Sequence, residues 1–454
     1  MERFFLASSH TYDVIVIGVG GMGSATVYEL SRRRAPGSRR NLRVLGLEQF
    51  DIPHDRGSSH GHTRIIRLAY YEHPSYVPLL LRSYELWREI EKKVGEELLR
   101  TMGSVDASPP GHDVFKGSLL SCEIHGLRHE VLTSRELTRR YPGYHLPAET
   151  MALLQPDGGF LLPERCIVSF VEQAQAKGAA IHGRERVLGW NVTPGGGVRV
   201  DTERGSYEAG ALVITAGAWA RTLIPQLKRL AVPERQVLAW FQPRKPGLFQ
   251  PETFPVFNLH VEEGRYYGFP VHGVPGFKLG RYHHLGEPID PDSPDRGCNP
   301  LDEQILREFT DKYFPDASGP TMALKACMFT NSPDEHFIID VHPSHPQVSF
   351  AAGFSGHGYK FCSVVGEVMA DLATKGATRH DIALLRLGRF KRAGGRARRP
   401  TGIKGSTRRR VSSSRYLWQY AARSRLDARK QLMTCSRCTS MKHVRIPVKP
   451  KKIG

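Results

Sequence analysis

Three glycines near the N-terminus have the spacing that brings a backbone close to a pyrophosphate. Gly18, Gly20 and Gly23 follow the β-branched run 12–17 and lead into residues 24–34, which carry helix-forming side chains. At such a strand-to-helix turn the first glycine permits the tight turn, the second lets the phosphates approach, and the third lets helix and strand pack closely. The N-terminus of the helix adds unpaired N–H groups for the phosphates.

An acidic residue follows the next predicted strand, residues 42–47. The carboxylate of Glu48 can accept hydrogen bonds from both ribose hydroxyls of an adenosine. Strand, glycines, helix, strand and acid agree with one another, and this context favours dinucleotide binding over a purely structural glycine turn. The pattern does not by itself distinguish NAD from FAD.

Two further segments have the composition of ligand-binding loops. Residues 51–67 are polar and rich in glycine, and then become apolar between two arginines. On composition alone, a solvated loop is an equal alternative there. Residues 353–361, GFSGHGYKF, place Gly356 and Gly358 before a predicted helix, where N–H groups could face an anion or an electron-rich ring. Two such helix N-termini suit a long cofactor with two ends.

The remaining segments predict an α/β (α+β) protein with discontinuous domains. Residues 76–94 and 162–178 favour helices, and 211–217 favours a buried strand that ends at glycine. Residues 225–320 are rich in aromatic residues and proline, and alternate as an antiparallel sheet does. The predicted ranges are 10–100, 151–225 and 321–390 for a nucleotide-binding domain, 101–150 and 226–320 for a substrate domain, and 391–454 for a disordered tail.

The positive charge of the chain is concentrated in that tail. The 454 residues carry 64 Lys plus Arg against 45 Asp plus Glu, a formal charge of +19. Residues 391–454 hold 20 of the basic residues and one of the acidic ones, which leaves 44 of each in the body. A neutral body has no electrostatic footprint for nucleic acid. The alternative function of another class is therefore nonspecific binding of polyanions or nucleic acid through the tail.

Several other classes of protein are disfavoured. The sequence contains no run of about 18 apolar residues, so we expect no membrane span. Seven cysteines at irregular spacings argue against a disulfide framework and for a reducing compartment inside the cell. We expect no metal, because the histidines are not at a ligand spacing. The sequence thus predicts a soluble intracellular protein, with the cytoplasm and the peroxisome left open as compartments.

Several strings, in order, resemble one known family from residue 12 to residue 390. They are VIVIGVGGMGSA, LEQFDIPHDRGSSHGHTRIIR, ITAGAW, YYGFP, GFKLG, CMFTNSPDEHFIID and GFSGHGYKF. They resemble the monomeric sarcosine oxidase and pipecolate oxidase family of FAD-dependent amine oxidases. The resemblance implies a glutathione-reductase-type, Rossmann-like FAD-binding domain with an antiparallel-sheet substrate domain over the flavin.

The resemblance also implies how the cofactor is held. It assigns Cys327 to a covalent bond with the flavin, with Lys325 or the flavin environment lowering the pKa of the thiol. Without it, a buried core cysteine is the favoured interpretation. It places Arg64 and His60 beside the flavin ring, where a loop ion pair is the alternative. The implied FAD-binding residues are Gly18, Gly20, Gly23, Glu48, Cys327, Gly356 and Gly358.

The same resemblance implies roles on the substrate side. Arg67 and Lys360 would bind the substrate carboxylate. Lys278 would approach the flavin and activate O2, because a cation stabilises superoxide in a site of low dielectric; a solvent-facing lysine is the alternative from spacing alone. Tyr267 would lie over the flavin ring, although a core aromatic residue would look the same in sequence.

The implied reaction is oxidation of the C–N bond of a secondary amino acid. A hydride equivalent passes to the flavin, the imine hydrolyses, and O2 is reduced to hydrogen peroxide. Sarcosine, which would give glycine and formaldehyde, is the first expectation for a monomeric enzyme; L-pipecolate and N-methyltryptophan are the alternatives. Bacterial members of the family have histidine four residues after the lysine, whereas this chain has Tyr282, which weakens a specific claim for sarcosine.

Overall fold

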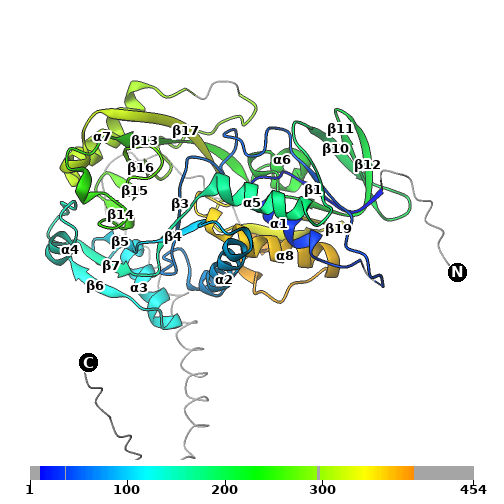
Figure 1. Ribbon diagram of the computed structural model, residues 1–454, viewed down its shortest axis with the longest axis horizontal. Coiled ribbons are helices and arrows are strands. Elements are labelled where there is room, and N and C mark those ends of the chain that lie inside the picture. The colour runs from blue at the N-terminus through cyan, green and yellow to red at the C-terminus, as the bar shows by residue number, and fades with distance from the viewer. Residues whose placement is uncertain (1–10, 36, 294–296, 393–454) are drawn as a thin grey trace, which may run out of the picture. The chain divides into compact units, whose positions relative to one another are not determined.

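The glycine turn follows the first strand of a sheet of eight strands, several of which are labelled in Figure 1. The computed structural model describes residues 11–35, 37–293 and 297–392. The strands of this sheet are β1 (Thr11–Ile17), β2 (Val44–Leu47), β9 (Ala180–His182), β10 (Val187–Val192), β11 (Val198–Thr202), β12 (Gly205–Ile214), β18 (Ile338–His342) and β19 (His345–Ala352). β9, β2, β1, β12 and β19 are parallel neighbours in that order, so their carboxyl ends meet at one edge. The glycine turn and Glu48 both lie at this edge.

The two faces of the sheet are covered differently. Alternate residues of β1 point to opposite sides, as the pleat requires. Val14 and Val16 pack against helices, whereas Ile15 and Ile17 join a second cluster that contains residues of β11 and of the short helix α6. The helices on the first face are α1 (Gly21–Ser31), α2 (Val77–Val94), α5 (Pro163–Gln175) and α8 (Cys362–Lys375); α6 spans Ala220–Leu223. This arrangement confirms the predicted Rossmann-like fold.

Local sequence sets the ends of these helices. α2 has proline in its first turn and ends at Gly95, whose φ of 71° is the left-handed conformation that glycine adopts easily. α5 begins at Pro163. The described 3-10 helices are η1 (Pro74–Tyr76), η2 (Gly217–Trp219), η3 (Pro225–Leu227), η4 (Pro246–Leu248), η5 (Pro315–Ala317), η6 (Tyr359–Phe361), η7 (Ala383–Leu385) and η8 (Leu387–Arg392).

A second sheet of eight strands has the order β17-β13-β16-β15-β14-β5-β7-β6. Its strands are β5 (Ser104–Ser108), β6 (Glu130–Thr133), β7 (Met151–Gln155), β13 (Val232–Phe241), β14 (Val256–Val261), β15 (Gly264–Phe269), β16 (Phe277–Arg281) and β17 (Thr321–Asn331). All neighbours are antiparallel except β5 and β14, which are parallel. α3 (Asp113–His125), α4 (Ser134–Arg140) and α7 (Pro300–Tyr313) accompany this sheet.

Two strands of the second sheet fall in ranges that the sequence assigned to the nucleotide-binding domain. β7 lies within 151–225 and β17 within 321–390, yet β7 pairs with β5 and β6, and β17 pairs with β13. The described residues form one compact unit. The domain boundaries remain a proposal, and the predicted tail, apart from its first two residues, lies outside the described residues.

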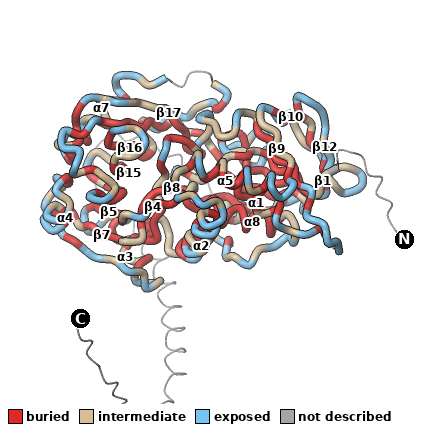
Figure 2. The backbone as a smooth tube through the Cα atoms, in the orientation of Figure 1, coloured by how far each residue is buried: buried red, intermediate tan, exposed pale blue. Residues whose placement is uncertain are grey.

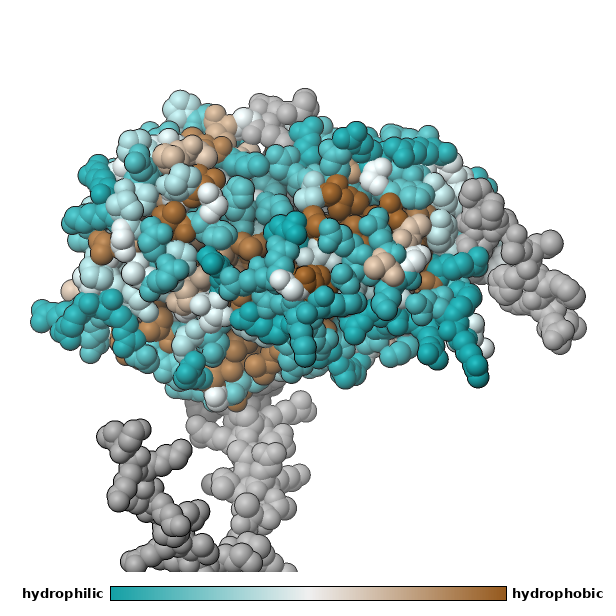
Figure 3. All heavy atoms as spheres, viewed as in Figure 1, coloured by the Kyte–Doolittle hydropathy of each residue, from teal (hydrophilic) through white to brown (hydrophobic). Residues whose placement is uncertain are grey.

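A third, smaller sheet consists of three short strands. β3 (Arg64–Ile66) and β4 (Leu99–Thr101) both pair with β8 (Gly159–Leu161). Buried backbone is concentrated in the strands of the sheets and in the helices packed on them (Figure 2). On the face drawn in Figure 3, apolar side chains gather in separate groups among hydrophilic ones. No helix among the described residues is long and apolar enough to cross a membrane.

Candidate active site

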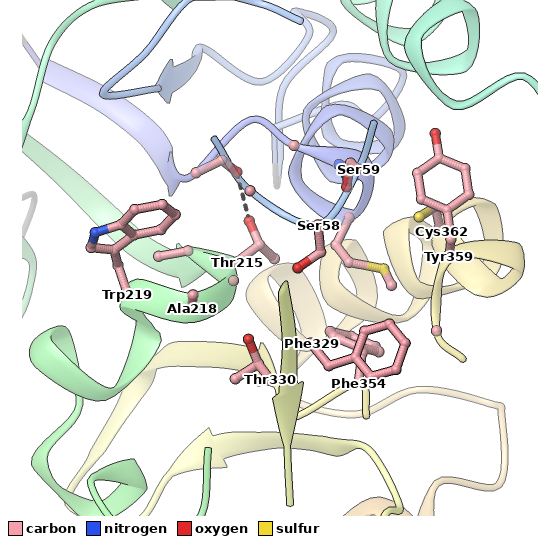
Figure 4. Close-up of a pocket in the computed structure, with 18 of the residues that line it drawn as sticks. Ser58, Ser59, Thr215, Ala218, Trp219, Phe329, Thr330, Phe354, Tyr359 and Cys362 are labelled. Carbon is pink, nitrogen blue, oxygen red and sulfur yellow. Dashed lines mark hydrogen bonds between the residues drawn. The ribbon is translucent and has the colours of Figure 1, made fainter. Parts of the chain in front are cut away.

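A cavity of about 400 Å³ is lined by residues of both large sheets. Figure 4 shows part of its wall, with Ser58 and Ser59 from one loop, Thr215 and Trp219 from another, and Phe329 from β17. Most of the predicted site residues line this cavity. They are Gly18, Gly20, Glu48, Arg64, Arg67, Tyr267, Cys327, Gly356, Gly358 and Lys360. Gly23, His60 and Lys278 are not in the lining.

The glycine turn has the backbone geometry expected of a phosphate site. Gly18 has a φ of 87°, and its carbonyl oxygen accepts a hydrogen bond of 2.8 Å from the Thr215 hydroxyl (Figure 4). A Cβ atom on Gly23 would lie 1.7 Å from the Gly18 oxygen, so only glycine allows the helix to pack there. Gly20 is the N-cap of α1, and because it has no side chain it leaves the N-terminus of the helix accessible to a ligand.

Glu48 is fixed beside this turn. Its carboxylate accepts the N–H of Val19 at 2.9 Å and the N–H of Phe50 at 3.1 Å. Burial raises the pKa of Glu48, although these backbone donors favour the charged form. The acid therefore connects β2 to the glycine turn and faces the same cavity, as a ribose-binding acid must.

The thiol of Cys327 lies against Arg64. Cys327, on β17, is buried and lines the cavity, and its Sγ atom is 3.8 Å from Nη2 of Arg64. Arg64 also donates to the carbonyl oxygens of Ser58 at 2.8 Å and Thr63 at 2.9 Å, so the alternative of a loop ion pair is not what the structure shows. Lys325, which the sequence suggested as the cation beside the thiol, forms an ion pair with Asp55 at 3.2 Å.

Lys278 is buried behind the cavity wall rather than exposed to solvent. Its Nζ atom donates to the carbonyl oxygen of Gly61 at 2.7 Å, and to the carbonyl oxygen and hydroxyl of Thr63 at 2.9 Å each. Burial, and then the charge of Arg64, lower the pKa of Lys278. Three oxygen acceptors nevertheless match the three N–H groups of its ammonium form. The lysine thus ties β16 to the loop that follows β2.

His60 is buried, and neither of its ring nitrogens has a hydrogen-bond partner among the described residues. Burial, and then the charges of Arg64, Lys325 and Lys278, hold its pKa well below the usual value, so the ring is neutral at pH 7. Buried polar atoms in folded proteins are nearly always hydrogen-bonded. Both ring nitrogens of His60 could therefore accept or donate a hydrogen bond to a ligand, although His60 is outside the cavity lining.

Arg67 is held by acids that the sequence did not single out. Its Nη2 atom donates to both carboxylate oxygens of Glu72 at 2.8 and 2.9 Å, and Nη1 donates to the carbonyl oxygen of Ala69 and lies 3.7 Å from Asp106. Burial opposes ionisation of Glu72, but Arg67, His357 and Lys360 hold its pKa at about 2. Glu72 lies five residues after Arg67, whereas Asp106 has no sequence signal because it sits inside a fully buried strand.

Aromatic side chains form another part of the wall. Tyr267, Tyr282 and Phe329 all line the cavity. The Tyr282 ring is 5.2 Å from Tyr267 and 5.7 Å from Phe329 between ring centroids, and the guanidinium of Arg265 stacks on it at 3.8 Å. The departure noted in the sequence, tyrosine at 282, is therefore located at the cavity itself.

His283 links two acids next to this wall. Its ring nitrogens lie 2.9 Å from Glu234 and 3.2 Å from Glu335, and its φ of 58° is unusual for a residue other than glycine. Hydrogen bonds to Glu234 and Glu335 raise the pKa of His283 to about 9. This folded-state pKa lies above the usual value of about 6.5. Protonated His283 therefore stabilises the folded protein fully below pH 6.5, and this stabilisation is lost as pH rises through about 9.

Replacing His283 by asparagine should remove the part of the pH dependence of the unfolding free energy that His283 contributes. Between pH 7 and pH 10 we expect the urea midpoint of the native protein to fall further than that of His283→Asn. Urea unfolding monitored by tryptophan fluorescence at both pH values measures the difference. Equal falls in the two proteins would show that His283 is not the titrating group.

Comparison with known proteins gives one family. The sequence model described as FAD dependent oxidoreductase matches residues 13–372. A monomeric sarcosine oxidase of Streptomyces avermitilis is 43% identical over 83% of this chain and 97% of its own length, and one from a Bacillus species is 41% identical over 84% and 97%. The peroxisomal sarcosine oxidase of Homo sapiens is 34% identical over 86% of this chain and 98% of its own length.

Solved structures agree on the fold. NikD, an amino acid oxidase essential for nikkomycin biosynthesis, superposes with a TM-score of 0.71 at 24% identity, over 83% of this chain and 97% of its own. The L-proline dehydrogenase of P. horikoshii superposes with a TM-score of 0.72 at 22% identity, over 84% and 98%. At this identity the likeness concerns the arrangement of the chain alone.

Proposed function

The chain belongs to the family of FAD dependent oxidoreductases, and on this premise we propose that it oxidises the C–N bond of a small secondary amino acid with O2, releasing hydrogen peroxide. Sarcosine is the substrate that we place first, because the relatives above 40% identity are sarcosine oxidases. The products would be glycine and formaldehyde. The observation that carries the proposal is that two buried basic side chains, Arg67 and Lys360, line the same cavity as the glycine turn and Cys327.

The residues present fit FAD at both ends of the cavity. Gly18, Gly20 and Glu48 suit the adenosine and pyrophosphate. Arg64, Tyr267 and Cys327 line the same cavity and suit the flavin end. When bound, FAD supplies the chemistry of hydride uptake and electron transfer to O2. The protein supplies position and charge: Arg64 places a cation beside Cys327, and Lys278 holds a buried cation close by.

The substrate carboxylate is assigned to Arg67 and Lys360. A guanidinium held in place by Glu72 does not need to reorganise when a carboxylate arrives, and burial strengthens the interaction because the dielectric is low. The aromatic wall then surrounds the rest of the amino acid and excludes water. We also propose that the protein is a monomer, as the bacterial relatives are named.

A larger secondary amino acid is the second candidate. Tyr282 and Phe329 give the wall an aromatic character that suits a ring or an indole better than a single methyl group. An N-methyl-L-tryptophan oxidase of Yersinia pestis is 33% identical over 84% of this chain. Peroxide release from sarcosine, L-pipecolate, L-proline and N-methyl-L-tryptophan ranks the candidates by kcat/KM. The absence of peroxide with all four would overturn the proposed function.

We propose that Cys327 carries the flavin covalently. Cys327 would hold the flavin through a thioether bond, and O2, which the proposed reaction uses, would accept the two electrons and two protons that formation of this bond removes. The guanidinium of Arg64 lies 3.8 Å from the sulfur of Cys327, on the wall of the same cavity. This link is independent of the choice of substrate.

Acid precipitation tests the covalent link. The native protein should give a yellow precipitate, whereas Cys327→Ser should give a colourless precipitate and a yellow supernatant. Cys362→Ser is a matched control because Cys362 is a second buried cysteine that lines the cavity, and its precipitate should stay yellow. Flavin that remains with the denatured Cys327→Ser protein would place the bond on another residue.

A further inference from the structure

Arg67 and Lys360 differ in how far their hydrogen-bonding capacity is used. Arg67 donates to Glu72 and Ala69. The Nζ atom of Lys360 donates to one described acceptor, the carbonyl oxygen of His357, at 2.6 Å. Nζ also lies 5.2 Å from the ring centroid of Tyr70 and 5.7 Å from that of Phe361. Lys360 thus retains two positions at which it can gain or lose a proton toward the cavity.

The backbone of Lys360 is fixed, so that its amine has a defined place. Its carbonyl oxygen accepts hydrogen bonds from the Ser83 hydroxyl at 2.6 Å and from the Trp87 indole N–H at 3.0 Å. Both donors belong to α2, which packs against α8. A lysine held at its backbone and buried at its amine can act at a single point in the cavity.

His357, the other base near the substrate end, is blocked at both nitrogens. Its Nε2 atom is 2.9 Å from the carbonyl oxygen of Glu335, which can only accept, so Nε2 carries the hydrogen. Nδ1 is therefore the bare nitrogen, and it accepts the Tyr70 hydroxyl at 2.5 Å. Burial lowers the pKa of His357 to about 4, which agrees with a neutral ring. This histidine has no free lone pair for a substrate.

Several other titratable groups that line the described cavity are also unsuitable. The phenols Tyr267 and Tyr282 and the thiol of Cys362 have pKa values raised by burial, so they are already protonated. Guanidinium groups are permanently charged. Glu48 is engaged at the glycine turn with Val19. Lys360 lines the same cavity and is close enough to Arg67 for their charges to interact.

Amine oxidation needs such a group. An α-amino acid reaches the site as a zwitterion, and its ammonium nitrogen has no lone pair to stabilise the carbon that loses hydride. A proton must therefore leave the nitrogen first. In an α-amino acid the nitrogen and the carboxylate are attached to the same carbon, so the side chain that anchors the carboxylate is also close to the nitrogen.

We propose that Lys360 takes the proton that the substrate ammonium loses. One N–H bond of the ammonium breaks and its electron pair stays on the substrate nitrogen, while the Nζ lone pair of Lys360 forms a new N–H bond. No electron is transferred. The newly charged lysine then pairs with the substrate carboxylate, so a single step activates the amine and strengthens the anchor. This inference rests on the proposed amine oxidation.

The charges around Lys360 support this exchange. Burial, and then the positive charge of Arg67, lower the pKa of Lys360 to about 7, while negative charges on Glu72 and Asp106 oppose that shift. Above pH 7 the empty site therefore holds mostly a neutral amine. A carboxylate that enters the site raises the affinity of Lys360 for a proton. The groups that face Lys360 are Arg67, Tyr70, Glu72, Asp106, His357 and Cys362.

The pH profile of kcat/KM distinguishes a Lys360 that accepts the substrate proton from a Lys360 that supplies only a positive charge. In the native enzyme a neutral lysine and a zwitterionic substrate carry one proton between them, so kcat/KM should be flat between pH 8 and 9. In Lys360→Arg the proton must leave to water, and kcat/KM should rise about tenfold over that unit, toward the amine pKa of about 10. A flat profile for Lys360→Arg would overturn the inference.

Two further variants distinguish charge from proton transfer. Arg67→Lys weakens the anchor but keeps the acceptor, so kcat/KM should fall at every pH while the plateau remains. Lys360→Met removes both charge and acceptor; its kcat/KM should be lower than that of Lys360→Arg and should also rise with pH. A plateau in Lys360→Met would overturn the inference even if Lys360→Arg does not fold.

Calorimetry provides a readout that does not depend on turnover. Methoxyacetate has the shape of sarcosine but no titratable nitrogen. Its binding to the FAD-loaded native protein at pH 8, measured in buffers of different ionisation enthalpy, should take up close to one proton per site, and binding to Lys360→Arg should take up none. Equal uptake in both proteins, or no uptake in the native protein, would overturn the inference.

Bleaching of the flavin by amino acids and calorimetry with methoxyacetate together separate this inference from the proposed function. If amino acids bleach the flavin but methoxyacetate binds without proton uptake, the oxidase function stands and the role of Lys360 is wrong. If methoxyacetate binds with proton uptake but no secondary amino acid is oxidised, the carboxylate site stands and the proposed function is wrong.

Discussion

Replacing Lys278 by methionine is expected to slow reoxidation of the reduced holoenzyme by O2 by about 10²–10³-fold. One-electron transfer to O2 creates superoxide, and a preorganised buried cation stabilises that charge more than water does. In the structure the Lys278 ammonium is fixed by three oxygens of Gly61 and Thr63, so its position needs no rearrangement. Anaerobic reduction by the amino acid should change by less than about tenfold, because the carboxylate anchors remain.

Stopped-flow mixing of the anaerobically reduced enzyme with oxygenated buffer measures this rate. Lys312→Met is a suitable control, because Lys312 is a half-exposed lysine on α7, paired with Glu263 and outside the cavity lining. Its reoxidation should match that of the native enzyme. Reoxidation of Lys278→Met at the native rate would show that the lysine has only a structural role.

Replacing Arg67 by methionine should cause two separable losses. The variant leaves the buried carboxylate of Glu72 without its partner, and breaking a buried pair in this way costs about 3–5 kcal/mol of unfolding free energy. It also removes a cation from the substrate carboxylate, which should lower kcat/KM by about 10²–10³-fold. Urea unfolding and steady-state kinetics measure the two effects.

The double variant Arg67→Met, Glu72→Gln distinguishes stability from binding. Removing the unpaired charge should recover most of the lost stability, whereas kcat/KM should stay low because the guanidinium is still absent. Glu72→Gln alone serves as the control for the loss of the acid. Recovery of kcat/KM in the double variant would mean that Arg67 acts through the fold rather than on the substrate.

The nucleotide half of the site could be predicted because its residues are close in sequence and each has a local reason. Gly18 requires a left-handed turn, Gly23 requires an absent Cβ, and Glu48 ends the next strand. These requirements concern a few neighbouring residues, so they can be recognised without the tertiary fold. The family resemblance added Cys327 and Lys360, which no local pattern could have connected with the turn.

The residues that contact Arg67 and its neighbours at the substrate end of the cavity could not be predicted in the same way. Asp106 lies in a strand whose residues are all buried, and its partners Ser118 and Asn258 come from distant elements. The carbonyl oxygen of Glu335, a residue with a φ of 61°, lies 2.9 Å from Nε2 of His357, which is 22 residues further along the chain. Such contacts arise from packing between elements, and sequence periodicity carries no information about them.

Two helices in the range 101–150 also escaped prediction, for different reasons. α3 contains glycine and several serines, which are weak helix formers, and it lies beside β5 and β7. α4 begins with a capping box of Thr133 and Glu136, a local signal that was available in the sequence. The first helix depends on tertiary contacts, whereas the second is only seven residues long and has a local signal at its start.

The cavity takes its wall from Ile17 at one end of the body and Cys362 at the other. This span has a consequence for biosynthesis. The glycine turn emerges from the ribosome early, but β17 and the loop before α8 emerge only when nearly the whole body has been made. A nascent chain can therefore contact the adenosine end of a dinucleotide long before it can enclose the ring end. Cofactor capture becomes a late event of translation, and a chain released before residue 362 lacks one wall of its own site.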